Sequence, residues 1–165
     1  MSAEKVHADP YVGFQFAVTF HQNDLMGGPR TKIPLCAGAF SEVSGLEATM
    51  TPFTFNEGGR NYGMLHRVGH VDFGTVILKR GMTKGRDLWK WFELVNQTAA
   101  SAVRLDVKIQ MRDAANQPVL MWKLLRALPV KFKAADLSAM RGTEVAIEEL
   151  HLVHEGFEFV PGGGA

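Results

Sequence analysis

Two histidines near the end of the chain, His151 and His154, are the first residues whose type and spacing suggest chemistry. Imidazole nitrogens bind zinc, but a zinc site needs several ligands that converge on one point. The surrounding residues favour a β-strand, in which side chains three positions apart point to opposite faces. His66 and His70 bracket a glycine, again with no further ligand nearby, and the chain has no CxxC or HExxH motif. We therefore expect no metal site.

Glu148 and Glu149 have the residue type that general acid–base catalysis uses. Adjacent residues of a strand face apart, however, and no partner residue suggests a substrate cleft. Because the apolar alternation changes phase at this pair, we expect a β-bulge there, with the two carboxylates in solvent or between subunits. The segment 81–85 lacks the GxxxxGK[ST] spacing of a phosphate loop, and no GxSxG motif occurs. We expect no catalytic activity and no cofactor.

The charge balance also argues against a nucleic-acid binder. Eighteen lysines and arginines offset 17 aspartates and glutamates, which leaves a formal net charge of +1, whereas nucleic-acid binders usually carry a basic excess. Lys131 and Lys133 flank Phe132, a pattern that is more typical of a strand edge than of base stacking. The single cysteine, Cys36, cannot form an internal disulfide, and we expect it to be a buried apolar residue.

The N-terminal residues lack the apolar core of a signal peptide, and no run approaches the roughly 18 apolar residues of a membrane span. We expect the protein to be made in the cytoplasm and to leave it, if at all, as part of a larger particle, for instance by lysis.

Most of the chain has a hydrophobic period of two, which predicts β-strands. Large apolar residues alternate in segment 14–20 and again in segment 103–111. The turn-forming residues 113–117 then precede a further extended run at 119–125, so segments 103–111 and 119–125 are predicted to form a hairpin. The polar face of segment 103–111 consists of Arg104, Asp106, Lys108 and Gln110. We expect this face to be in contact with water.

Only one segment has a helical period. Leu88, Trp91, Phe92 and Val95 form a single apolar stripe, and Asp87 is a plausible N-cap. The chain contains no internal repeat or linker, so we predict one domain over residues 1–165, with flexible ends at 1–9 and 161–165. The predicted fold is mainly β, with one short helix.

Six strings extend beyond these patterns and occur in a fixed order. They are DPYVGFQFAVTF (9–20), GAFSEVSGLEA (38–48), FNEGGRNYG (55–63), VILKRGM (76–82), LWKWFE (88–93) and VAIEELHLVHEGFE (145–158). In order and spacing they resemble the tail tube family of contractile-tailed phages, which is shared by phage-tail-like extracellular contractile injection systems. The resemblance covers roughly residues 9–159.

The resemblance implies two packed antiparallel β-sheets with a flanking helix. It also implies six-membered rings in which the inner sheets join edge to edge into a barrel, and a hollow tube of stacked rings that sheath contraction drives through a target envelope. The implied partners are other copies of the chain, the sheath protein, a baseplate or tube initiator, a tail terminator, and DNA or an effector as cargo. A ring-forming tube protein of the type VI secretion kind is the alternative. A small β-barrel enzyme would need an enclosed pocket with convergent polar groups, for which no cluster is evident.

The resemblance assigns the stretch from Phe53 to His66 to an arm that reaches an adjacent subunit or ring. The residues agree with this, because three glycines permit unusual backbone conformations and the aromatic and charged side chains could contact a neighbour. The expected contact residues are Phe53, Phe55, Asn56, Glu57, Gly58, Gly59, Arg60, Asn61 and Tyr62. The polar face of segment 103–111 is expected to line either the bore of the tube or its outer, sheath-facing surface.

Overall fold

The computed structural model describes residues 15–22, 32–33, 40–59, 62–98, 104–136, 138–140, 142 and 144–161. Cys36, the predicted flexible segment 1–9 and residues 162–165 lie outside these residues. The first residue of the predicted flexible tail 161–165, Pro161, is instead the last residue of β10. The strands are β1 (Gln15–Gln22), β2 (Lys32–Ile33), β3 (Phe40–Ser44), β4 (Ala48–Phe55), β5 (Leu65–Phe73), β6 (Val76–Gly81), β7 (Leu105–Arg112), β8 (Pro118–Lys133), β9 (Ile147–Val153) and β10 (Gly156–Pro161), and the helix α1 spans Asp87–Thr98. The mainly β fold with one short helix confirms the prediction.

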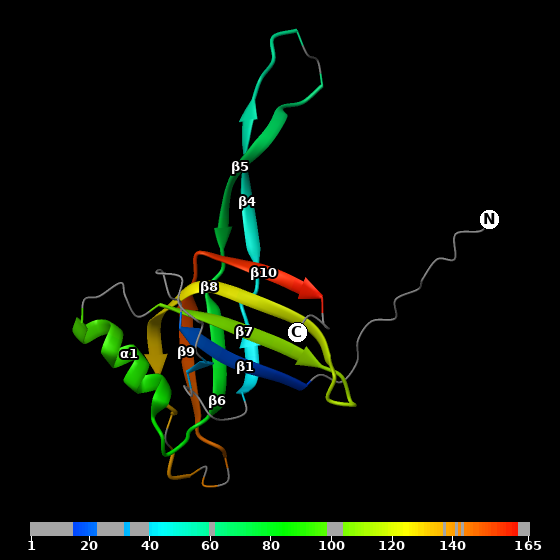
Figure 1. Cartoon of the computed structure of the whole chain (residues 1–165). Helices are drawn as coiled ribbons and strands as arrows, with labels where there is room; N and C mark the ends of the chain where they lie inside the picture. The colour runs from blue at the N-terminus through cyan, green and yellow to red at the C-terminus, as the bar shows by residue number, and fades with distance from the viewer. Residues whose placement is uncertain are drawn as a thin grey trace, which may run out of the picture.

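The long strand β8 connects two antiparallel layers (Figure 1). Its first half pairs with β7 on one side and with β10 on the other, and its second half pairs with β9. We call β2-β1-β7-β8-β10 the first sheet and β8-β9-β6-β3 the second sheet. The predicted hairpin is confirmed as β7 and β8, joined by a turn in which Asp113 Oδ1 accepts hydrogen bonds from the Ala115 and Gln117 amides.

A β-bulge bends β8 between the two sheets. Leu105 faces Ala127 and Val107 faces Leu124, so β8 has one extra residue opposite Asp106. Arg126 has a φ of 51° at this point, and its amide donates a 3.0 Å hydrogen bond to Asp106 Oδ1. Asp106 is only 1% exposed. The prediction of a wet face is therefore wrong at Asp106, because this carboxylate turns inward to satisfy the bulge amide.

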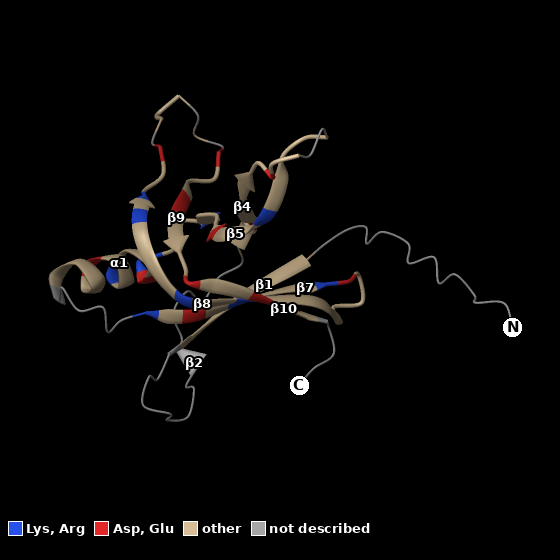
Figure 2. Cartoon of the chain, turned by 90° about the horizontal axis from the view of Figure 1, so that it is seen from above, with Lys and Arg blue, Asp and Glu red and all other residues tan. Residues whose placement is uncertain are grey.

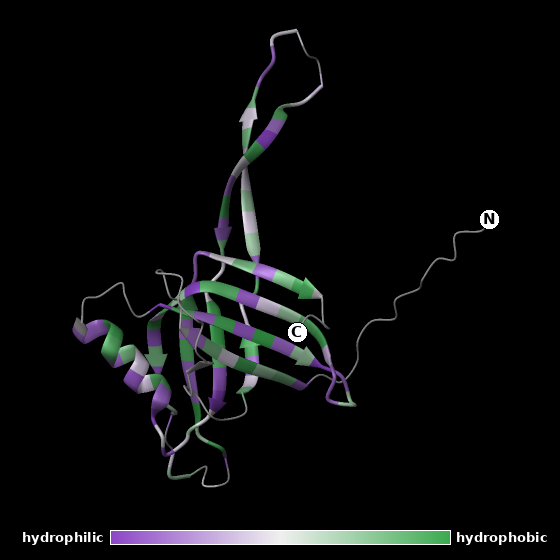
Figure 3. Ribbon diagram, viewed as in Figure 1, coloured by the Kyte–Doolittle hydropathy of each residue, from purple (hydrophilic) through white to green (hydrophobic). Residues whose placement is uncertain are grey.

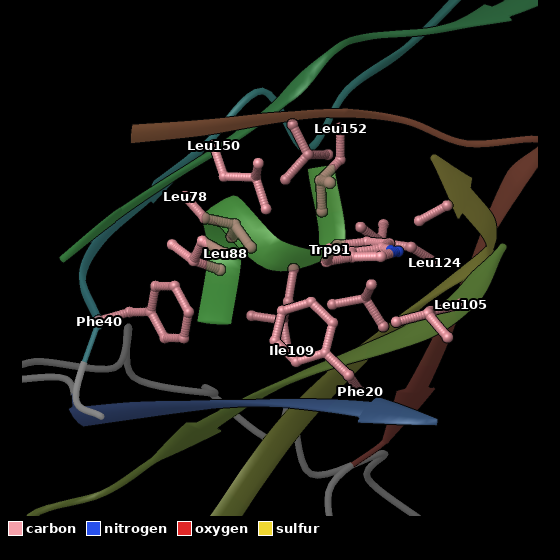
Figure 4. Close-up of a cluster of buried hydrophobic side chains, with 13 residues drawn as sticks. Phe20, Phe40, Leu78, Leu88, Trp91, Leu105, Ile109, Leu124, Leu150 and Leu152 are labelled. Atoms are coloured by element: carbon pink, nitrogen blue, oxygen red, sulfur yellow. The ribbon is translucent and has the colours of Figure 1, made fainter. Parts of the chain in front are cut away.

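The hydrophobic core lies between the two sheets and α1 (Figure 4). Alternate residues of the strands point into it, which accounts for the alternating hydropathy along the strands (Figure 3). The buried set is Phe20, Phe40, Val76, Leu78, Leu88, Trp91, Leu105, Val107, Ile109, Leu124, Ala127, Leu150 and Leu152. Phe20 and Trp91 meet edge to face at 5.6 Å, which ties the helix to the first sheet.

An ion pair is buried beside this core. Arg80 on β6 is fully buried, Glu148 on β9 is 3% exposed, and Arg80 Nε lies 2.6 Å from Glu148 Oε1. Glu148 is in phase with the buried Leu150 and Leu152, and the register of β9 with β6 is continuous. The predicted bulge at Glu148–Glu149 is therefore wrong. The charged Glu148 occupies a core position where an apolar residue was expected, so the alternation looked as if it changed phase although the strand is regular.

The helix begins one residue earlier than predicted. The Arg86 carbonyl accepts the first helical hydrogen bond, from the Lys90 amide at 3.0 Å, so Arg86 is the N-cap and Asp87 lies in the first turn. Leu88 and Trp91 are buried, as the apolar stripe predicts. Trp89 meets Phe132 of β8 edge to face at 5.4 Å, and this contact covers part of the second sheet.

Candidate assembly interface

The most prominent feature of the surface is an arm, the two-stranded hairpin of β4 and β5, which projects far from the rest of the fold (Figure 1). Its strands pair antiparallel from Ala48↔Phe73 to Phe55↔Leu65. Its exposed apolar side chains are Met50, Phe53, Phe55, Met64, Val68, Val71 and Phe73. A lone two-stranded hairpin is marginally stable in water, so this much exposed apolar surface indicates a partner.

The predicted contact residues lie at the far end of this arm. Phe53 is 65% exposed and Tyr62 is 86% exposed. The Arg67 guanidinium lies over the Phe55 ring at 4.7 Å, a cation–π contact across the hairpin. Asn56, Glu57, Gly58 and Gly59 are also exposed at the tip, with Gly59 at a φ of 93°. Arg60 and Asn61 lie outside the described residues.

The backbone of the arm and its base leave little space for side chains. A Cβ at Gly69 would lie 1.8 Å from the Thr51 carbonyl oxygen, so only glycine permits the irregular pairing at mid-arm. At the base, Gly45 has a φ of 81°, and its Cβ would lie 2.0 Å from the Thr75 carbonyl oxygen. Phe73 packs against His154 and Phe157 at 5.4 and 5.6 Å. The arm thus leaves the body from a closely packed base.

The first sheet presents two edges with unpaired backbone. Among the described residues β10 pairs only with β8, and β1 pairs with β2 only at Phe20 and His21, so residues 15–19 have one open side. Phe159, on β10, is 55% exposed. Open strand edges promote association with another chain unless they are covered. The arm also leaves the body on the β10 side (Figure 1).

The strands of the first sheet contain charged residues of both signs (Figure 2). Of the four predicted residues, Arg104, Lys108 and Gln110 are half-buried and Asp106 is buried. Lys123 lies 3.9 Å from Asp106 Oδ2 and 3.6 Å from Glu158 Oε2. Glu155 binds Arg104 at 2.7 Å and Arg126 at 2.8 Å. The sequence did not reveal Lys123, Glu155 or Glu158, because their pairing depends on the register of β8 and β10.

The described residues contain no group of three or more metal-ligating side chains. An open hollow of about 630 Å³ lies between the end of β8 and the segment before β9. Two of its charged residues bind each other: Lys133 Nζ lies 3.0 Å from Asp136 Oδ2, and this hydrogen bond raises the pKa of Lys133. No helix in the part of the chain that the structure describes is long and apolar enough to cross a membrane.

The decisive comparison is with protein families. Residues 12–158 match the family described as T4-like virus tail tube protein gp19. The chain belongs to the tail tube protein family. The match covers nearly the whole sequence and confirms the resemblance that the six ordered strings indicate. A search of curated protein sequences finds no match.

Solved structures agree with this assignment. The chain is 26% identical to a chain in a structure described as the anti-feeding prophage baseplate, 6-fold symmetrised, with a TM-score of 0.71 over 93% of this chain and 97% of that one. A chain of an extracellular contractile injection system sheath-tube complex is 20% identical, with a TM-score of 0.72 over 94% of both chains. Hcp1 from Flavobacterium johnsoniae has the same fold, at 14% identity and a TM-score of 0.51 over 90% of this chain and 95% of that one.

This tail tube protein is therefore a structural component of a phage tail or contractile injection particle. The likeness to Hcp1 shows that the type VI secretion alternative shares this fold, but at 14% identity it does not assign the chain to that class. The monomer has an open sheet rather than a closed barrel, in keeping with a subunit that is completed by its neighbours.

Proposed function

We propose that six copies form a ring in which β10 of one subunit pairs with β1 of the next, and that the rings stack into a hollow conduit. The observation that carries this proposal is the pair of open edges on the first sheet. β1, β7, β8 and β10 alternate in direction, because each neighbouring pair is antiparallel. Because these four strands are even in number, copies related by rotation about the tube axis meet with β10 antiparallel to β1 of the next copy, so the ladder continues around the ring.

The arm supplies the second contact of the proposed assembly. It extends past the β10 edge, so it reaches beyond its own body to an adjacent subunit of the same or the next ring (Figure 1). Its exposed Phe53, Val68 and Met64 would be covered there. Glu57 and Arg60 are the proposed partners for intersubunit charge pairs. Packing against a neighbouring subunit would stabilise the hairpin, because an isolated pair of strands is only marginally stable.

The proposed role is mechanical and needs no catalytic step. Sheath protein surrounds the tube, a baseplate component initiates it and a terminator caps it, while DNA or an effector occupies the bore. Support comes from the descriptions of the structural neighbours, which include a baseplate, a tube-terminating cap and a sheath-tube complex. The subunit would thus be found in an assembled tail or released particle.

Electron microscopy of the purified protein in negative stain, with solution mass on the same sample, tests the assembly. We expect rings or hollow tubes at high concentration from the unaltered chain. Phe159→Glu places a charge at the β10 edge and should yield folded monomers, because the side chain is already 55% exposed in the monomer. Phe159→Leu is the matched control and should retain rings.

Glu57→Arg separates the contact made by the arm from the edge contact. We expect rings that stack into shorter tubes, with an unchanged monomer fold by circular dichroism. If this variant forms tubes of normal length, Glu57 takes no part in the arm contact. If it stays monomeric, the arm contacts a subunit of the same ring. If Phe159→Glu forms rings as readily as Phe159→Leu, the β10–β1 joint is wrong.

A further inference from the structure

The position of the core determines which face of the first sheet can line a bore. Phe20, Val107 and Leu124 point from this sheet into the core, so the second sheet and α1 lie on that side. If the first sheets join edge to edge into a ring, the bulk of each subunit must lie outside, where the circumference is larger. The opposite face, which carries Lys108, Lys123 and Glu158, then faces the bore. This step rests on the ring proposed above.

The cross-strand register arranges this bore face in rows. One row runs Thr19↔Lys108↔Lys123↔Glu158 across β1, β7, β8 and β10, and contains three charges. The next row runs Ala17↔Gln110↔Met121↔Val160 and contains none. A charged row is thus followed by a neutral row along the strands, and a passing polymer would meet charges at some levels of the bore and not at others.

The carboxylates that the structure describes on or beside the bore face are balanced by cations of the same subunit. Lys123 lies near both Glu158 and the inward-turned Asp106, and Glu155 bridges Arg104 and Arg126. The negative and positive charges of these two groups cancel. Any excess charge on the bore face must therefore come from other residues.

Two cations on this face have no carboxylate partner among the described residues. Lys108 forms no ion pair, and it lies directly opposite Lys123, a second cation. Arg112 donates hydrogen bonds only to the neutral side chains of Gln110 and Asn116. The two residues are four positions apart on one strand, or about 13 Å at the usual rise. Counted over the residues that the structure describes, each subunit thus adds two positive charges without a carboxylate partner, and a ring repeats them at every subunit.

We propose that this face makes the bore weakly cationic and that it retains acidic polypeptide cargo. Cations that are spaced along a channel attract an anionic chain while each contact stays weak and sensitive to salt. Duplex DNA is a less suitable occupant, because its phosphates would engage many rings at once and the binding would grow with tube length. A polypeptide with dispersed carboxylates would be held and still be able to slide.

Co-sedimentation of assembled tubes with a fluorescent 20-residue poly-glutamate peptide tests this inference. A neutral glycine–serine peptide and a 20-base-pair DNA duplex serve as comparison probes. For unaltered tubes at low salt we expect binding of poly-glutamate well above the neutral peptide. Lys108→Glu with Arg112→Glu should weaken it roughly tenfold or more, and salt should have the same effect. Lys90→Glu with Lys84→Glu, two exposed lysines outside this face, makes the same charge change and should have little effect.

Microscopy of every variant separates the two proposals. If the unaltered chain forms no tube, the proposed function fails. If tubes form but bind poly-glutamate no better than the neutral peptide, or if the Lys84 and Lys90 variant weakens binding as much, the cationic bore is refuted. Where reversed charges prevent assembly, Lys108→Gln with Arg112→Gln removes the same two cations and should weaken binding in the same direction. DNA retained at physiological salt more tightly than poly-glutamate would overturn the assignment to polypeptide cargo.

Discussion

Removing one partner of the buried Arg80–Glu148 pair should destabilise the subunit severely. In Glu148→Ala the guanidinium of Arg80 stays fully buried, with Asp87 as its remaining carboxylate at 3.6 Å. The Phe40 ring at 5.7 Å offers only a weak cation–π contact. Breaking a buried ion pair in this way typically costs about 3–5 kcal/mol. For a chain of this size that corresponds to a decrease of roughly 10 °C in Tm.

Urea and thermal unfolding of the monomer measure this effect, with the Phe159→Glu background used if the chain assembles. Glu149→Ala is the matched control, because its side chain faces away from the core and is 23% exposed. We expect that control to change the free energy of unfolding by no more than about 0.5 kcal/mol. The double replacement Arg80→Met with Glu148→Leu should recover most of the loss, since well-packed apolar residues can replace a buried pair. A loss below about 1 kcal/mol for Glu148→Ala would refute the reasoning.

Two further changes test the bend and the arm. Asp106→Ala leaves the Arg126 amide without its charged acceptor, and we expect a loss of about 1.5–3 kcal/mol in urea unfolding, with Asp106→Asn losing less because the amide oxygen still accepts. No difference between the two variants would argue against the hydrogen bond as the cause. Gly69→Ala places a Cβ against the Thr51 carbonyl oxygen and should open the arm without lowering the stability of the body. Hydrogen exchange should increase in β4 and β5 alone, and an equal increase in β7 would contradict this.

The local elements could be predicted from the sequence because they depend on short-range patterns. The β7–β8 hairpin follows from alternation on both sides of a turn, and α1 follows from four apolar residues at helical spacing. The buried charges could not be predicted in the same way. Glu148 acquires its partner 68 positions away, and Asp106 satisfies an amide 20 positions away. The burial of a charged residue within a strand of alternating apolar residues is therefore predicted wrongly unless its distant partner is known.

The candidate interface was predictable in part for a similar reason. The glycines and aromatic residues between Phe53 and Tyr62 indicate an exposed loop, and the family resemblance gives it a role. Beyond the packed base at Phe73, both strands of the hairpin project from the body because no other part of the described chain packs against them. A local sequence pattern does not reveal this absence of tertiary contacts. The open edges of β1 and β10 likewise depend on strand order, which the alternation within one strand does not specify.

Because β8 belongs to both sheets, the two layers of the wall are joined by covalent bonds as well as by side-chain packing. When a tube is pushed against a resisting envelope, friction on one surface of the wall and thrust on the other would shear the layers past each other. In a sandwich whose sheets share no strand, such slippage is opposed only by side-chain packing and by the loops that connect the sheets. Here any sliding must straighten the bend at Arg126, so the shear load passes into a continuous backbone and its hydrogen-bonded neighbours. A tube of such subunits would resist delamination under axial force.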